Sequence, residues 1–358
     1  MKKYIILLCM LLLIFLVKKE KKYILILRNK SEFNKSIGQF RYNLYLKHNY
    51  YPRRKRTSEY VHSIHFHLSY LPTQQKFNET KELFKNINYD NKTIIRGILL
   101  DNIIESKYKT TKLFRKYKNI AKYYPKTVLY NDKNVKNELR KLNLKSPIFL
   151  KKDLDGKRGI IVVNGIDKIL KGFKKNYLLA QEQVPNPLKV KNYNFVIRSY
   201  AIVYICEKNS KTLYLSGYGK VNYPMDKKGL ITYTNKMTKG MDTLKGKPGT
   251  TTELSKYFKK DLNKILHNTS LEFFKTIKKD IKKINFLKNN SAYTLYGFDY
   301  MFDKDFNPYI LELNLYPSMN PYLKDVKISM KYYSELILNE IKILNKDFKS
   351  ITYKSIKL

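Results

Sequence analysis

The strongest constraint on the fold of this chain is a pair of strand-like segments near the C-terminus, residues 295–303 and 308–314. The four residues 304–307 separate them. A loop of four residues is common in β-hairpins, and Asp305 and Asn307 are residue types that favour turns. The two segments are therefore expected to form an antiparallel hairpin.

The predicted hairpin fixes which side chains share a face. Counting outward from the loop, Asp303 faces Pro308 and Asp299 lies directly opposite Glu312. Asn314 follows two residues later and joins the same face, because side chains alternate along a strand. Three oxygen-bearing side chains are thus expected to meet on one face of the hairpin.

Two carboxylates that face each other repel and destabilise a strand pair. A divalent cation removes that conflict, and Mg²⁺ prefers oxygen ligands, commonly one or two carboxylates together with substrate phosphates. The sequence therefore predicts a magnesium site made by Asp299, Glu312 and Asn314, with Leu311 and Leu313 pointing the other way into a core. The alternative is a hairpin with one hydrated, polar face.

A second segment, residues 149–160, is suited to phosphate binding. Its strand ends in Lys151 and Lys152, and the loop that follows contains Gly156 and Gly159. Lysines neutralise phosphate charge, and glycines let backbone N–H groups approach closely. An ordinary basic hairpin turn would have the same pattern, so this segment alone leaves both interpretations open.

A third segment runs from a strand over residues 179–184 into a bend fixed by Pro185 and Pro187. Proline fixes the backbone angle φ and thereby the direction of the chain. The backbone groups of this bend are candidates for binding the edge of an adenine ring.

The remainder of the chain predicts an α+β protein with a boundary near residue 145. Helical spacing of apolar residues precedes this boundary, whereas short strands and glycine loops follow it. The predicted organisation is a signal-anchor or transmembrane segment (1–22), a basic linker (23–57), an N-terminal α/β domain (58–145), a larger α+β domain (146–345) and a tail (346–358).

The N-terminus predicts a membrane anchor. Residues 4–17 are apolar and are flanked on both sides by lysines, with no small-residue cleavage site after them. The run is shorter than the roughly 20 residues of a usual spanning helix, but flanking lysines can extend their charges to the interface. The denser lysines on the C-terminal side would leave the body in the cytosol. A buried strand or helix is the alternative, and residues 23–27 form either a strand or an extension of the anchor.

The charge of the chain favours polyanionic partners. Lys and Arg number 72 against 29 Asp and Glu, a formal net charge of +43. Such a surface attracts nucleic acid, anionic membrane, nucleotide or an acidic protein segment. A coding bias toward Lys, Asn, Ile and Tyr would give the same excess without any partner. No nucleic-acid-binding motif accompanies the charge, so nucleic acid is the least favoured partner.

The cysteines and histidines of the chain give little support for a disulfide or a metal site. Cys9 and Cys206 provide neither a disulfide framework nor zinc-ligand spacing, which favours a reducing compartment. His62, His65 and His67 lie in an alternating segment without a Cys or carboxylate at ligand spacing. A half-exposed strand is the favoured interpretation of that segment, and a zinc site is the alternative.

The order of these motifs resembles the ATP-grasp fold, and more closely the tubulin–tyrosine ligase-like family, over roughly residues 90 to 330. Residues 181–188 resemble the family's "Q-x-Y-I-x-x-P-L" hinge, and residues 195–200 resemble its "K-F-D-x-R-x-Y" strand. The other matching pieces, in family order, are the segment 124–127, the pair Thr234–Asn235, and the metal-binding end formed by 297–299 with 311–317. Only this last piece is individually specific.

The resemblance implies an ATP-grasp domain over residues 146–345 that uses ATP and Mg²⁺. Phosphate would be bound by Lys151 with Lys152, Gly156 and Gly159. The adenine pocket would be lined by Gln181, Gln183 and Val184. Arg198, Lys220 and Asn235 would hold phosphate or the acceptor carboxylate, and Asp299, Glu312 and Asn314 would bind the metal.

The family joins an amino acid to a protein carboxylate through an acyl-phosphate, typically on an acidic tubulin tail. Glutamate is the donor weakly favoured by the resemblance, with tyrosine and glycine also possible. A strongly basic enzyme would capture such a tail well.

The sequence departs from the family pattern at four positions. Asn194 and Val196 replace the lysine and aspartate before Arg198, Lys220 stands where the family usually has arginine, and Lys152 replaces a proline. Loss of the aspartate removes a polar contact expected near the nucleotide. Two other functions therefore remain open: an ATP-grasp ligase for a small molecule or peptide, and a non-catalytic nucleotide-binding pseudoenzyme.

Overall fold

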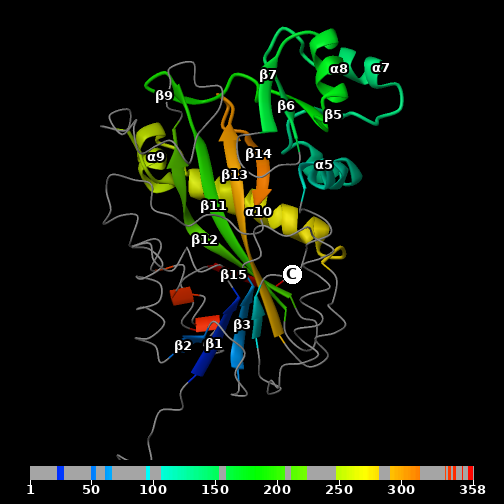
Figure 1. Cartoon of the computed structure of the whole chain (residues 1–358). Coiled ribbons are helices and arrows are strands. Elements are labelled where there is room, and N and C mark those ends of the chain that lie inside the picture. The colour runs from blue at the N-terminus through cyan, green and yellow to red at the C-terminus, as the bar shows by residue number, and fades with distance from the viewer. Residues whose placement is uncertain are drawn as a thin grey trace, which may run out of the picture.

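The computed structural model describes residues 22–27, 50–53, 61–66, 94–96, 106–152, 159–205, 211–223, 247–281, 291–314 and 354–357, with the single positions 335, 338, 339, 342, 343 and 349. Helices and strands are mixed in it, in agreement with the predicted α+β class (Figure 1). The described chain forms two main sheets and one two-stranded hairpin.

The larger sheet has nine strands in the order β15-β12-β11-β13-β4-β3-β1-β2, with β14 paired to β13. Its antiparallel part consists of β11 (Val196–Ile205), β12 (Lys211–Asn222), β13 (Ser291–Phe302), β14 (Pro308–Asn314) and β15 (Lys354–Lys357). The parallel part consists of β1 (Lys22–Leu27), β2 (Tyr50–Arg53), β3 (Val61–Phe66) and β4 (Ile94–Arg96), which joins β13.

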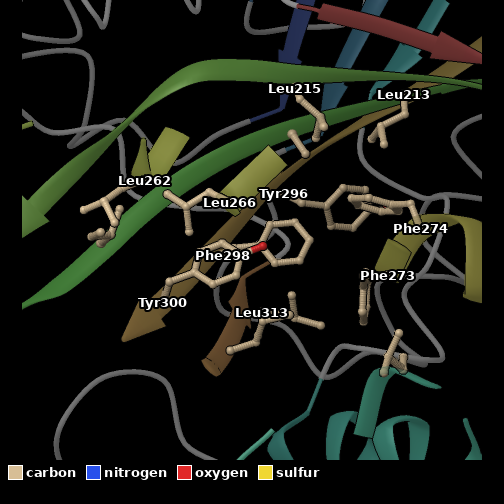
Figure 2. Packing of buried hydrophobic residues seen from close by; sticks show 14 of the residues in the cluster. Leu213, Leu215, Leu262, Leu266, Phe273, Phe274, Tyr296, Phe298, Tyr300 and Leu313 are labelled. Carbon is tan, nitrogen blue, oxygen red and sulfur yellow. The ribbon is translucent and has the colours of Figure 1, made fainter. Parts of the chain in front are cut away.

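Two helices, α9 (Thr251–Phe258) and α10 (Leu262–Ile277), cover one face of the antiparallel part. On β13, Tyr296 and Phe298 pack against Phe273 and Phe274 of α10 in the main core, and Tyr300 stacks on Phe298 (Figure 2). Aromatic rings of this size bury large apolar areas and hold helix to sheet. The opposite face of β11–β14 is therefore free to carry polar side chains.

The chain breaks between α9 and α10 at a defined position. Lys259 adopts a left-handed backbone conformation (φ 52°) that ends α9, and the Asp261 side chain accepts a hydrogen bond from Lys264 N at 3.0 Å to begin α10. Thr250 and Glu253 form a capping box at the start of α9.

The smaller sheet is antiparallel in the order β5-β8-β6-β7. Its strands are β5 (Thr127–Leu129), β8 (Leu179–Glu182), β6 (Ile148–Lys151) and β7 (Ile160–Val163). Helices α7 (Val135–Arg140) and α8 (Ile166–Lys174) pack with it around a second, separate core. A short hairpin of β9 (Lys189–Val190) and β10 (Tyr193–Asn194) then leads into β11.

Two further helices, α5 (Lys107–Lys116) and α6 (Lys118–Ala121), lie against α10. Lys116 pairs with Asp280 at 2.7 Å, and Lys122 pairs with Glu272 at 3.1 Å. Phe114 stacks on Tyr124 and also contacts Phe273. These contacts hold the C-terminal end of α5, together with α6, against α10.

The predicted domain boundaries stay predictions, although two observations bear on them. Strand β5 precedes residue 145 yet pairs with β8, and strands β1 and β2 lie in the segment predicted to be a linker. His62 and His65 lie in β3, as the alternating pattern predicted for that segment.

The prediction of a membrane-anchored protein is corrected by the structure. No helix in the described part of the chain is long and apolar enough to cross a bilayer. Residues 1–21 lie outside the described residues, and the next apolar patch is the strand β1, paired with β2 and β3, rather than an extension of a helix. The N-terminal anchor helix of the predicted fold is therefore not supported.

Candidate active site

A row of four charged residues crosses the face of the large sheet opposite helices α9 and α10. In the strand registers Lys220 of β12 pairs with Arg198 of β11, Arg198 pairs with Asp299 of β13, and Asp299 pairs with Glu312 of β14. Residues in direct register on neighbouring strands point to the same face. Lys220, Arg198, Asp299 and Glu312 are called the charged row below.

The predicted pairing of Asp299 with Glu312 is confirmed, but the strand register between this pair and the turn differs from the prediction. The hairpin closes with Phe302 opposite Pro308, so the prediction that Asp303 faces Pro308 was wrong by one residue. A β-bulge between Asp299 and Tyr300 then compensates for the shift. A bulge adds one residue to one strand, and a count based on regular alternation cannot detect it.

The bulge also changes where Leu311 lies. Leu313 is buried in the main core with Phe298, as predicted. Leu311 instead packs with Val184, Val196 and Met301 on the face that carries the charged row. The prediction that both leucines point away from the site was therefore wrong for Leu311.

Asp303 fixes the turn of the hairpin. Its carboxylate accepts hydrogen bonds from the backbone N–H groups of Asp305 at 2.9 Å and Asn307 at 2.8 Å, and from Asn307 Nδ2 at 2.9 Å. Phe306 takes the left-handed conformation (φ 64°) that the tight loop requires. This rigid turn determines the register on which the charged row depends.

Asp299 forms a two-point ion pair with Arg198. Arg198 Nε donates to Asp299 Oδ1, and Arg198 Nη2 donates to Oδ2 at 2.7 Å. The two side chains are only 12% and 13% exposed. Burial raises the pKa of Asp299, although Arg198 opposes the shift. The same carboxylate outweighs burial at Arg198 and raises the pKa of the guanidinium.

Glu312 is held by Lys107, the first residue of α5, at 3.0 Å between Lys107 Nζ and Glu312 Oε1. Burial opposes ionisation of Glu312, but the charges of Lys107, Lys151 and Arg198 outweigh it and lower the pKa of this carboxyl. The Nδ2 atom of Asn314 lies 3.5 Å from Asp299 Oδ2. All three predicted metal ligands thus meet in one place.

Lys151 reaches the charged row from the small sheet. Its ammonium donates to Gln181 Oε1 at 2.5 Å, and Gln181 Nε2 in turn donates to Thr127 Oγ1 at 3.0 Å. Burial lowers the pKa of Lys151 to about 8, while the negative charges of Glu312 and Asp299 oppose that shift. The site therefore lies between the two sheets, with contributions from both.

Lys220 ends the charged row next to Arg198. Burial and the neighbouring guanidinium both disfavour a second positive charge and lower the pKa of Lys220 to about 7. An ammonium of this kind titrates near neutral pH, which an arginine at the same position would not do.

The segment after β8 is anchored to the hairpin turn. Gln183 N donates to Pro147 O at 3.2 Å, Lys304 N donates to Asn186 O at 2.8 Å, and Leu188 N donates to Phe302 O at 2.8 Å. Val184, 2% exposed, is buried with Val196 and Met301. Gln181 therefore lies beside Lys151, and Val184 belongs to the apolar cluster, whereas Gln183 is placed by its backbone contact with Pro147.

Among the predicted site residues that the structure describes, Lys152 is not brought to the charged row. Lys152 points away from it, with its ammonium 4.9 Å from the centre of the Tyr177 ring, although its backbone N–H donates to Gly159 O at 2.7 Å. Gly156 and Asn235 lie outside the described residues.

Sequence reasoning missed Lys107. Its position gave no signal, because lysine is abundant throughout the chain and the helical spacing of apolar residues before residue 145 did not show which lysine would face β14. The cap at Ser106, whose Oγ accepts from Lys109 N at 3.0 Å, marks the helix start that places Lys107 there.

The donor set is suited to Mg²⁺. Two carboxylates share a register position, their charges are neutralised by Arg198 and Lys107, and the Asn314 amide can present its oxygen by rotation about its last side-chain bond. The surrounding cations Lys151, Arg198 and Lys220 are arranged to bind anionic groups such as phosphates.

Comparison with known proteins points to one family. Residues 221–349 match the family model described as the Tubulin-tyrosine ligase family. A stretch of 103 residues is 32% identical to a protein named Tubulin glycylase 3F from Tetrahymena thermophila. That stretch is 28% of this chain and 11% of the relative, so the chain matches only a small part of the relative's length.

Proposed function

We propose, on the match of residues 221–349 to the model of the Tubulin-tyrosine ligase family, that this chain is an ATP- and Mg²⁺-dependent ligase that joins an amino acid to a protein carboxylate. The family consists of ATP-dependent ligases that add amino acids to proteins. The observation that carries the proposal is the charged row, in which two opposed carboxylates meet Lys107 and Lys151 between two sheets.

We propose the ATP-grasp arrangement for the two sheets. Nucleotide would lie between the small sheet, which contributes Lys151, and the large sheet, which contributes Asp299 and Glu312. Binding between two α/β layers buries the reacting phosphates and excludes water, which strengthens each electrostatic contact. The ion-pair geometry described above supports this arrangement.

The roles proposed for the residues follow from their charge and position. Asp299, Glu312 and Asn314 hold Mg²⁺, which supplies charge neutralisation at the phosphates. Lys151, with Lys107, neutralises phosphate, and the segment containing Gln181, Gln183 and Val184 contacts the adenine. Gly156 and Gly159 would supply backbone N–H groups to phosphate.

Arg198 and Lys220 are proposed to hold the acceptor carboxylate and the transferred phosphoryl group, with Asn235 as a further contact. In the first step an acceptor carboxylate oxygen attacks the terminal phosphorus of ATP, and the bond to ADP breaks. In the second step the amine of the donor amino acid attacks the acyl carbon, phosphate leaves, and the amine loses a proton. Both steps develop negative charge beside Arg198 and Lys220, where fixed cations stabilise it.

The acceptor we propose is an acidic protein tail of the tubulin type. The relative named a tubulin glycylase supports this choice, and the net charge of +43 favours capture of an acidic tail. Glutamate is the donor that the family resemblance favours, and the name of the relative adds weight to glycine.

A second candidate function is nucleotide binding without turnover. Asn194 and Val196 stand where the family pattern has lysine and aspartate, and Asn194 is buried at the end of β10. The alternative keeps the nucleotide site but lacks ligation, so an assay that measures binding and transfer separately distinguishes the two.

The test is an incorporation assay with the full chain, ATP, Mg²⁺ and a synthetic acidic tubulin-tail peptide. Glycine, glutamate and tyrosine are supplied separately, and the peptide mass is read by mass spectrometry. The proposal predicts a mass increase of one residue for at least one donor, which the Glu312→Gln variant loses. ATP binding without any mass increase would support the pseudoenzyme, and no ATP binding would overturn both functions.

A further inference from the structure

Asn222, the last residue of β12, is a buried amide without a hydrogen-bonding partner for its oxygen in the described structure. Its side chain is 3% exposed, and the Oδ1 atom accepts no hydrogen bond from any described residue. In the strand register Asn222 lies directly opposite Val196 of β11. An apolar residue in its place would avoid the cost of an unsatisfied buried amide.

The strand register places Asn222 on the face of the charged row. Lys220, two residues before it, belongs to that row, whereas Val221 between them is buried in the main core under the helices. Side chains two residues apart on a strand share a face. Its cross-strand partner Val196 packs with Val184 and Met301, so the amide borders the apolar cluster beside the segment after β8.

The pair formed by Val196 and Asn222 also coincides with a departure from the family pattern. Val196 stands where the resemblance places an aspartate, and a valine cannot make the polar contact near the nucleotide that the resemblance implies for this position. Side chains paired directly across two strands lie about 5 Å apart at their Cβ atoms. A polar group on Asn222 can therefore reach the same part of a ligand from the neighbouring strand.

We propose that Asn222 supplies this missing contact, binding the nucleoside part of ATP by accepting a hydrogen bond from a sugar hydroxyl. The inference rests on the proposed nucleotide site and specifies which chemical group of the nucleotide this residue recognises. A neutral oxygen acceptor cannot bind phosphate oxygens, because these are hydrogen-bond acceptors themselves. In the proposed site Lys151 and Arg198 bind the phosphates. Apolar Val184, Val196 and Met301 beside it are suited to the face of a base.

The test compares the binding of four nucleotides to the full chain in Mg²⁺: ATP, 2′-deoxy-ATP, 3′-deoxy-ATP and the triphosphate of purine riboside. For the wild type we expect one deoxy analogue to bind about tenfold more weakly than ATP, because a buried acceptor is then left unpaired. In Asn222→Val this discrimination disappears, and ATP itself binds about tenfold more weakly. Asn119→Val, an exposed asparagine on α6, serves as the matched control and leaves both values unchanged.

A stability measurement separates recognition from a structural role. Because the oxygen of Asn222 has no partner in the described protein, Asn222→Val should unfold thermally at the wild-type temperature or above it. A fall in the unfolding temperature together with unchanged nucleotide discrimination would overturn the proposal.

The remaining outcomes are also decisive. Loss of discrimination against the purine riboside analogue, rather than against a deoxy sugar, would overturn the sugar assignment. If the wild type binds ATP in an Mg²⁺-dependent manner but Asn222→Val keeps the discrimination, only the role of Asn222 fails. If the wild type binds no ATP, the proposed function fails instead.

Discussion

At the scale of residues, the site is a set of charges that compensate one another. Asp299 and Glu312 face each other in direct register, and each is neutralised by a cation from a different element, Arg198 from β11 and Lys107 from α5. Without these cations the paired carboxylates would destabilise the hairpin. We propose that this arrangement presents the two carboxylates to a metal ion.

Lys151 leads to a prediction about pH. Its pKa is about 8, with Glu312, Asp299, Lys107 and Gln181 around it, so it is partly neutral above neutral pH. Bound phosphate favours the charged form and raises the pKa, so ATP binding at pH 8 should take up protons, and the affinity should fall as pH rises from 7 to 9. Lys220, with a pKa of about 7, adds to the uptake near neutral pH.

Calorimetric titration in buffers of different ionisation enthalpy measures this proton uptake. The Lys151→Arg variant retains a positive charge at every pH and should show less uptake at pH 8 than the wild type. An uptake that is equal in the two proteins would mean that Lys151 does not contact phosphate.

At the scale of elements, close packing positions the charged row. Gly219, next to Lys220 on β12, donates its N–H to Thr251 Oγ1 at 2.7 Å. A Cβ atom at Gly219 would lie 2.4 Å from Ile197 Cγ2 and 3.0 Å from Thr251 Cγ2. Contacts this short leave no room for a side chain between β11, β12 and the start of α9.

The Gly219→Ala variant tests this packing. Because the neighbouring methyl groups belong to short β-branched side chains, the backbone must shift, and the free energy of unfolding should fall by about 1–3 kcal/mol. Urea unfolding measures the change. The control is Thr252→Ala, an exposed position on α9, which should change the free energy of unfolding by less than about 0.5 kcal/mol. Equal stability of Gly219→Ala and the wild type would contradict the described contact.

The hairpin shows how much of the site the sequence could predict. Asp299, Glu312 and Asn314 were found because alternation and a turn-forming loop determine which side chains meet over a few residues. The bulge, the position of Leu311 and the contact of Lys107 were not predicted. A bulge leaves no mark in residue alternation, and the approach of α5 to β14 depends on packing between segments far apart in the sequence.

The same limit applies to the fold. The α+β class and most strands after residue 146 follow from local patterns, whereas the pairing of β4 with β13 and of β5 with β8 joins distant segments. The apolar patch at residues 23–27 was open to two interpretations, and only strand pairing with β2 and β3 decided between them. Local hydrophobicity alone could not distinguish a buried strand from part of an anchor.

At the scale of the whole molecule, the positive charge should govern encounter with an acidic acceptor. A net charge of +43 attracts an acidic tail before the two molecules touch. Dissolved salt screens this attraction. We expect the KM for an acidic tail peptide to rise by roughly tenfold between about 50 and 300 mM NaCl, because association slows. A peptide with glutamine in place of its non-acceptor glutamates should show a higher KM and a weaker salt dependence. A salt-independent KM for the acidic peptide would show that the charge serves another purpose.

The central proposal for the whole molecule is that the chain binds Mg²⁺–ATP through Asp299 and Glu312. Titration calorimetry of the full chain with ATP, with and without Mg²⁺, tests it most directly. The comparison is between the wild type, the Asp299→Asn/Glu312→Gln variant and a matched control, Asp280→Asn/Glu272→Gln, which removes one aspartate and one glutamate that pair with Lys116 and Lys122 rather than with the row.

We predict binding that requires Mg²⁺, persists in the matched control and is lost when Asp299 and Glu312 are changed, with circular dichroism showing that each protein is folded. Absence of binding by the wild type, or equal binding by all three proteins, would contradict the claim.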